Sequence, residues 1–80
     1  MVEKSIIIKS YLEPQEVALS VQAASKFKCR LSLIVEEKTA NAKSIMGIIS
    51  LGMQEGQTLT ILADGEDANE AVAAMEQFYS

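Results

Sequence analysis

The spacing of hydrophobic side chains changes several times along this 80-residue chain, and the order of these changes constrains the fold most strongly. Residues 2–9 form a β-branched run, which predicts a strand with a buried centre. Pro14 suits the first turn of a helix, and apolar side chains repeat at helical spacing over 15–27. Residues 29–35 alternate between apolar and polar side chains. The first part of the chain therefore predicts strand, helix and strand.

The rest of the chain continues this alternation with shorter elements. A charged turn at 36–37 leads to a return strand over 38–42, a short helix is predicted over 44–53, and 57–63 alternates as another strand before a last helix. The complete order is strand, helix, strand, strand, helix, strand, helix. It favours an α+β fold in which helices cover a sheet, and it fills residues 1–80 as one domain without a linker or repeat.

Cap residues mark the ends of the two later helices. Gly52 or Gly56 can supply the left-handed residue that ends the short helix. Asp67 and Glu70 resemble a capping box at the start of the last helix. The apolar stripe predicted for that helix contains Ala68, Ala71, Val72, Met75 and Phe78.

Composition excludes several classes of protein. The net charge of −4, from 11 acidic and 7 basic side chains, disfavours nucleic-acid binding through a general basic field. The chain has no histidine and one cysteine, Cys29, so it offers neither an internal disulfide nor a metal or cofactor site. We expect Cys29 to be a buried apolar side chain. The absence of a signal peptide or membrane span predicts a cytoplasmic protein.

Ser44 precedes the short helix, and its role has two interpretations. In the first it is only an N-cap, whose hydroxyl accepts backbone N–H groups that lack a partner in the first turn. In the second it is also a phosphorylation site, because a phosphate there would meet free amides and the positive end of the helix dipole. Lys43, directly before Ser44, is expected to help offset the charge of the phosphate.

Apolar side chains cover most of the circumference of the short helix, so some of them must be exposed. We predict that Ile48 and Leu51 face the core. A thioether adapts to irregular surfaces, which suits protein recognition. The candidate partner-binding set is Ile45, Met46, Ile49 and Met53, of which Met46, Ile49 and Met53 are predicted to form the outward patch.

Three blocks of the sequence resemble HPr, the small phosphocarrier of the bacterial sugar phosphotransferase system, and its paralogue Crh. Residues 41–52 are similar to the regulatory-serine region, 21–27 to the second half of the first helix, and 62–67 to the approach to the last helix. The resemblance implies a four-stranded antiparallel sheet covered on one face by three helices. It also implies that the first two helices start close together, with Glu13 and Ser44 at the same end of the domain.

The segment that carries the phosphoryl group in HPr has changed in this chain. HPr uses a histidine in a His-Ala-Arg-Pro stretch, and the matching positions here are Glu13, Pro14, Gln15 and Glu16. Phosphoryl transfer through imidazole needs a ring nitrogen and a cationic or amide-rich cradle. Two acids without an arginine supply the opposite field. Glu13 is either drift at a solvated position, which we favour, or a fixed charge that imitates phosphohistidine.

The leading functional hypothesis is a regulatory protein that relays no phosphate and is not an enzyme. The resemblance implies that a serine kinase of the HPr kinase type modifies Ser44. It further implies that the phosphoprotein binds a transcription regulator such as catabolite control protein A, with Gln15 on the same binding face as the apolar set. One alternative is a degenerate phosphocarrier that uses Glu13 as an acyl phosphate. Another is an unphosphorylated scaffold or homodimer in which the helix patch meets its own copy.

Overall fold

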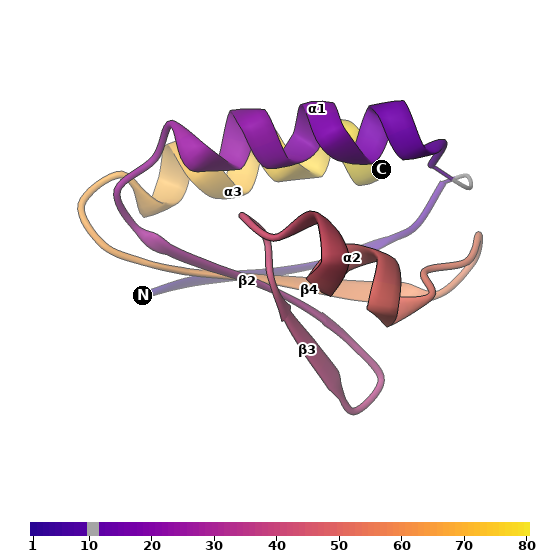
Figure 1. Cartoon of the computed structure of the whole chain (residues 1–80). Helices are drawn as coiled ribbons and strands as arrows, with labels where there is room; N and C mark the ends of the chain where they lie inside the picture. The colour runs from indigo at the N-terminus through magenta and orange to yellow at the C-terminus, as the bar shows by residue number, and fades with distance from the viewer. Residues whose placement is uncertain (10–11) are drawn as a thin grey trace.

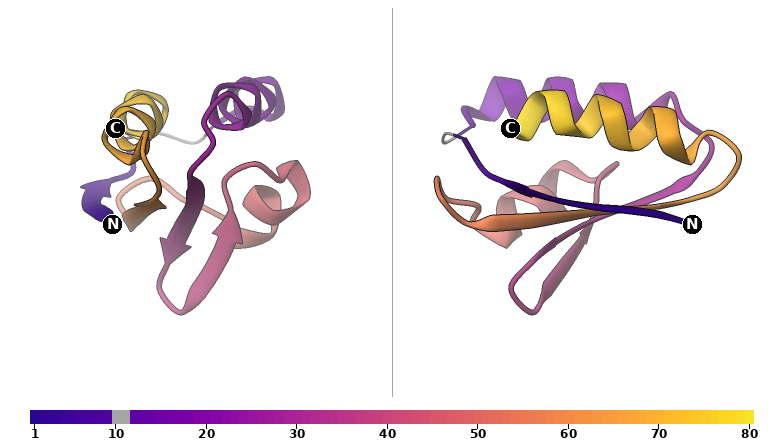
Figure 2. Two further views of the ribbon diagram at one scale, coloured as in Figure 1. Left: turned by 90° about the vertical axis from the view of Figure 1, so that its left-hand side faces the viewer. Right: turned by 180° about the vertical axis from the view of Figure 1, so that it is seen from behind.

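The computed structural model describes residues 1–9 and 12–80. Four strands form one antiparallel sheet in the order β1-β4-β2-β3, and three helices cover one of its faces (Figures 1 and 2). This confirms the predicted element order and the predicted open-faced α+β sandwich. The elements are β1 (Val2–Ile7), α1 (Pro14–Ser25), β2 (Arg30–Val35), β3 (Lys38–Asn41), α2 (Ile45–Leu51), β4 (Thr58–Asp64) and α3 (Ala68–Tyr79).

The alternating side chains of the sheet build the core. In β4, Leu59, Ile61 and Ala63 are fully buried under the helices, as the alternation predicted. β4 pairs with β1 on one side and β2 on the other, and its register places Ile61 opposite both Lys4 and Leu33. Leu33 and Ile61, which are both fully buried, are thereby neighbours on the inner face, where their burial stabilises the fold.

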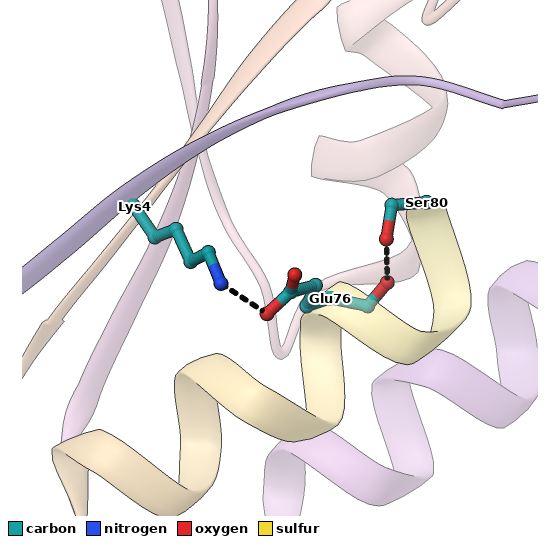
Figure 3. A network of polar contacts seen from close by, with 3 residues as sticks. All are labelled: Lys4, Glu76 and Ser80. Carbon is teal, nitrogen blue, oxygen red and sulfur yellow. Dashed lines mark hydrogen bonds and ion pairs between the residues drawn. The ribbon is translucent and has the colours of Figure 1, made fainter.

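Two polar contacts join α3 to the elements beside it. The hydroxyl of Tyr79 lies 2.9 Å from the Ser20 hydroxyl of α1, and both side chains are buried. At the other side of α3, the Lys4 ammonium of β1 pairs with the Glu76 carboxylate at 2.9 Å (Figure 3). The exposed pair adds little to stability. The Ser20 hydroxyl donates to the Val17 carbonyl at 2.7 Å, so it can accept the hydrogen bond that the buried Tyr79 hydroxyl needs to donate.

The stripe of α3 differs in one residue from the prediction. Ala68, Ala71, Val72 and Met75 are buried as expected, but Tyr79 is 1% exposed while Phe78 is only half-buried. The phenol of Tyr79 has a buried partner in Ser20, so a polar side chain can occupy the core position.

Several predicted ends of elements are confirmed. Gly52 ends α2 in the left-handed conformation, with φ of 62° and its N–H donating to the Ile49 carbonyl at 3.1 Å. Ser44 is the N-cap of α2, and Pro14 is the first residue of α1. Within the described residues, none of the helices is long and apolar enough to cross a membrane.

Candidate functional site

The start of α1 uses its polar groups internally. Glu13 is the N-cap, with extended backbone, and its carbonyl accepts the N–H groups of Glu16 at 2.9 Å and Val17 at 3.0 Å. The Glu16 carboxylate accepts the N–H of Glu13 at 3.2 Å. Pro14 contributes no N–H at all. This helix start therefore presents two carboxylates and few donors to an incoming phosphate, which is unfavourable for an anion.

The start of α2 carries the opposite chemistry. Ser44 has extended backbone, and its hydroxyl oxygen accepts the Gly47 N–H at 3.1 Å, which confirms the predicted N-cap. Gly47 leaves space for this contact, because a Cβ there would lie 3.3 Å from the Ser44 oxygen. The helix itself contains no charged side chain. Ser44 thus caps a helix that has no charged side chain of its own, and one backbone N–H, that of Gly47, donates to its hydroxyl oxygen.

Lys43, which is predicted to help offset a phosphate on Ser44, has its ammonium held by two backbone carbonyls. Its ammonium donates to the backbone carbonyls of Phe27 at 2.7 Å and Cys29 at 2.9 Å. Both carbonyls belong to the connection between α1 and β2. Lys43 therefore joins the start of α2 to the end of α1, and its charge is directed at these carbonyls instead of at Ser44.

The expectation that Glu13 and Ser44 lie at the same end of the domain is wrong. Contacts of Lys43 place Ser44 beside the residues that follow α1, whereas Pro14 at the start of α1 lines a cavity together with Gly52 at the end of α2. α2 therefore runs back toward the start of α1 (Figure 1). Twelve residues make α1 about 18 Å long, which separates its two ends. Gln15 is exposed in the first turn, at the end away from Ser44.

An exposed apolar surface lies between these two ends. We call it the α2 apolar face and define it as Ile45, Met46 and Ile49, which are 42%, 72% and 54% exposed. Ile48 and Leu51 are buried, which confirms the predicted division of α2 into inward and outward residues. Met53 was predicted to point outward, but its side chain is half-buried and packs against the core. The outward patch is thus narrower at its C-terminal end than the sequence predicted.

Beside the α2 apolar face lies a cavity of about 160 Å³. Sequence reasoning missed it, because its walls come from three segments that only the tertiary fold brings together. Its existence depends on the antiparallel placement of α1 and α2. The lining residues are Ile8, Leu12, Pro14, Val17, Ile48, Ile49, Gly52 and Met53.

The capping box predicted at Asp67 is also wrong. The Asp67 carboxylate accepts the N–H groups of Lys28 at 2.8 Å and Cys29 at 3.0 Å, and makes no side-chain cap to α3. These hydrogen bonds, chiefly the one from Lys28, lower the pKa of Asp67. Asp67 therefore fixes the start of α3 to the start of β2 instead of capping its own helix.

Cys29 has the structural role that the alternation predicted. It is 3% exposed. Burial raises the pKa of its thiol, and the neighbouring Asp67 raises this pKa to a smaller extent. A raised pKa leaves the thiol protonated and poorly nucleophilic. Across residues 1–9 and 12–80 there is no group of three or more histidine, cysteine or acidic side chains that could hold a metal ion.

Comparison with known proteins gives matches over nearly the whole chain. Residues 3–80 match the family described as "PTS HPr component phosphorylation site". The HPr-like protein Crh of Halalkalibacterium halodurans is 39% identical over 80 residues, which cover 98% of this chain and 95% of the relative. The structure of the phosphocarrier protein HPr from Bacillus anthracis superposes with a TM-score of 0.92 at 37% identity, covering 99% of this chain and 96% of the other.

A third relative is described as a dimer. Crh from Bacillus subtilis, a catabolite-repression protein, forms an intertwined dimer with a swapping domain. It is 33% identical and superposes with a TM-score of 0.70 over 98% of this chain and 92% of its own chain. The relatives thus include both a phosphocarrier and Crh proteins.

Proposed function

The chain belongs to the HPr family of the phosphotransferase system, and on this premise we propose that it is a regulatory member that binds a partner and carries no phosphoryl group. The observation that carries this proposal is the contrast between the two helix starts. Glu13, Pro14 and Glu16 at α1 offer a phosphate no nucleophilic imidazole and few donors. Ser44 at α2 offers a hydroxyl next to the backbone N–H of Gly47. The similarity to Crh supports a regulatory role over a carrier role.

In this proposal a serine kinase of the HPr kinase type phosphorylates Ser44. The phosphoprotein then binds a transcription regulator of the catabolite-control class. Phosphate oxygens form charge-assisted hydrogen bonds with basic groups of the regulator. Met46 and Ile49 of the α2 apolar face supply apolar contact area, and Gln15 extends the surface toward the start of α1. Lys43 keeps its charge while its ammonium is held by backbone carbonyls, and basic groups of the partner supply the direct hydrogen bonds to the phosphate.

A titration against the regulator tests this proposal. The protein modified by the kinase, the unmodified protein and the Ser44→Ala variant are titrated in parallel by calorimetry. We expect measurable binding for the modified protein only. Equal affinity of the modified and unmodified forms would contradict the proposal, as would the absence of any modification by an active kinase.

A homodimer is the second candidate function. It is supported by the dimer described for Crh of Bacillus subtilis and by the exposed α2 apolar face, in which Met46 is 72% exposed. The unmodified protein should then show the mass of a dimer in light scattering at micromolar concentration. If the α2 apolar face forms the dimer contact, Met46→Asp should convert the dimer to a monomer. An unmodified protein that is already a monomer would exclude the homodimer.

A further inference from the structure

The cavity between α1 and α2 has the size and chemistry of a receptor for one apolar side chain. Its volume is about 160 Å³, and none of the described residues that line it has a polar side chain. An apolar cavity of roughly 150 Å³ in another protein stays dry and binds benzene. A group of that size corresponds to the side chain of leucine, methionine or phenylalanine. A charged group would lose its hydration there and, among the described lining residues, would meet polar atoms of the backbone only.

The cavity is continuous with the surface already described. Ile49 belongs both to the α2 apolar face and to the cavity lining, and Met53 and Leu12 are half-buried at the same place. A molecule that covers the α2 apolar face therefore passes the mouth of the cavity. Core side chains Ile8 and Ile48 are buried and form the deeper part of the lining.

The charges next to the lining residues are mostly negative. Glu13 lies between the lining residues Leu12 and Pro14, Glu16 directly precedes Val17, and Glu55 follows Met53 by two positions. All three are exposed. Lys9, next to Ile8, is the one basic residue adjacent in sequence to the lining among the described residues, and α2 carries no charge. Among the described residues, these three exposed acids outnumber the one lysine that adjoins the lining in sequence, which favours a positively charged partner surface.

We propose that this cavity receives one large apolar side chain from a basic segment of the partner protein, with Glu13, Glu16 and Glu55 facing the basic groups of that segment. The proposal rests on the proposed function and deepens it, because it names the chemistry of the partner at the end of the site away from Ser44. The apolar side chain fills the cavity, while the acids select the charge of the segment around it.

Short synthetic peptides test the proposal on the unmodified protein. The first carries one central leucine flanked by lysines, the second replaces the leucine by alanine, and the third replaces the lysines by glutamates. Methyl resonances of Ile8, Ile48 and Met53 report on the cavity, and those of Leu19, which is exposed on α1 outside the lining, serve as the control. At low salt, we expect the first peptide to shift the cavity methyls with at least tenfold higher affinity than either of the others.

Two sets of variants locate the effect. Met53→Trp should fill the cavity and abolish the shifts at Ile8 and Ile48, whereas Leu19→Trp should leave them unchanged. Because Met53→Trp can disturb the fold, the amide spectrum is checked. A second variant, which combines Glu13→Gln with Glu55→Gln, keeps the cavity intact and should weaken binding of the basic peptide. The control variant combines Glu37→Gln with Glu66→Gln. Both acids are exposed and lie outside the cavity lining, so these substitutions should not change binding.

The outcomes separate this proposal from the proposed function. Cavity methyls that remain unshifted at millimolar basic peptide, or equal affinity for the lysine and glutamate peptides, would overturn the cavity proposal. Neither result affects the titration of the phosphorylated protein. Conversely, a protein that no kinase modifies at Ser44 can still bind the basic leucine peptide, because that experiment requires no phosphate.

Discussion

The starts of α1 and α2 differ in chemistry although both helices follow an extended cap residue. At α1, the Glu16 carboxylate accepts the cap N–H, Pro14 lacks an N–H, and two acids are exposed. At α2, the cap is the Ser44 hydroxyl, and the helix has no charged residue. One small domain therefore contains a helix start with two exposed acids and a helix start that is capped by an uncharged hydroxyl. The difference lies in side chains and amide donors, since both starts are helical.

The start of α1 also lacks the histidine that the resemblance to HPr assigns to phosphoryl transfer. The loss of histidine removes the nucleophile, and the structure shows that the surrounding residues have a consistent alternative role. Glu13, Pro14 and Glu16 form a well-capped helix start. Restoring the histidine alone would therefore leave a helix start that is built to cap itself.

Restoring phosphoryl transfer at α1 is the test with the largest expected effect. Glu13→His alone should accept phosphate from enzyme I poorly. Adding Pro14→Ala, Gln15→Arg and Glu16→Pro moves the proline from position 14 to 16, so an N–H returns at 14 and the one that Glu16 donates to the Glu13 carbonyl is lost. The same changes supply a cation and remove a carboxylate. Because one donor to a transition-state anion is worth about 100-fold or more in rate, we expect at least that difference between the two variants. Equal rates would show that the acids and the missing amide do not explain the loss.

Removing apolar contact from α2 should have the next largest effect. Met46→Asp should lower the affinity of the phosphorylated protein for its regulator at least tenfold, because it places a charge in the centre of the contact surface. Its 72% exposure predicts little change in folding stability. Leu19→Asp, at an exposed position of α1, is the matched control. Calorimetric titration measures both, and similar losses in the two variants would contradict a specific role of the α2 apolar face.

The cap of α2 can be tested through stability. Ser44→Ala removes the acceptor for the Gly47 N–H and should lower the free energy of unfolding by about 0.5–2 kcal/mol, as measured by urea denaturation. Ser44→Thr keeps a hydroxyl and should lose less. If alanine and threonine destabilise equally, the hydroxyl does not cap the helix as described.

The smallest expected effect concerns Asp67 at the start of α3, and it appears in how the stability of the fold depends on pH. The lowered folded pKa of Asp67 means that its hydrogen bonds stabilise the fold above its ordinary pKa of 3.8. This contribution is lost as the pH falls through the lower folded value. Asp67→Asn should therefore reduce stability at neutral pH and flatten its decline in acid, with Asp64→Asn as the control of matched charge. An unchanged acid profile would argue against the hydrogen bonds from Lys28 and Cys29.

Local patterns predicted much of the fold and part of the site. The hydrophobic spacing gave the order of elements, and it separated Ile48 and Leu51 from the outward Met46 and Ile49, because burial of one helix face is a local property. The relative direction of α1 and α2 was mispredicted, since it depends on the path of the chain between β3 and α2. Contacts over long sequence separations were also missed.

Two such contacts show why. Lys43 bonds to the carbonyls of Phe27 and Cys29, and Asp67 bonds to the amide of Lys28, 39 positions away. From the sequence, Lys43 was expected to face a phosphate on the neighbouring Ser44, and Asp67 was expected to cap the first turn of α3. The tertiary fold offers better-placed backbone partners instead, and no local pattern reveals them.

The most direct test compares the two helix starts in one experiment. The protein is incubated with enzyme I and phosphoenolpyruvate, and separately with an HPr-type serine kinase and ATP, and its intact mass and modified residue are determined. We predict no change in the first sample and one added phosphoryl group on Ser44 in the second. A phosphoryl group that is gained in the first sample and lost in Glu13→Gln would contradict the account.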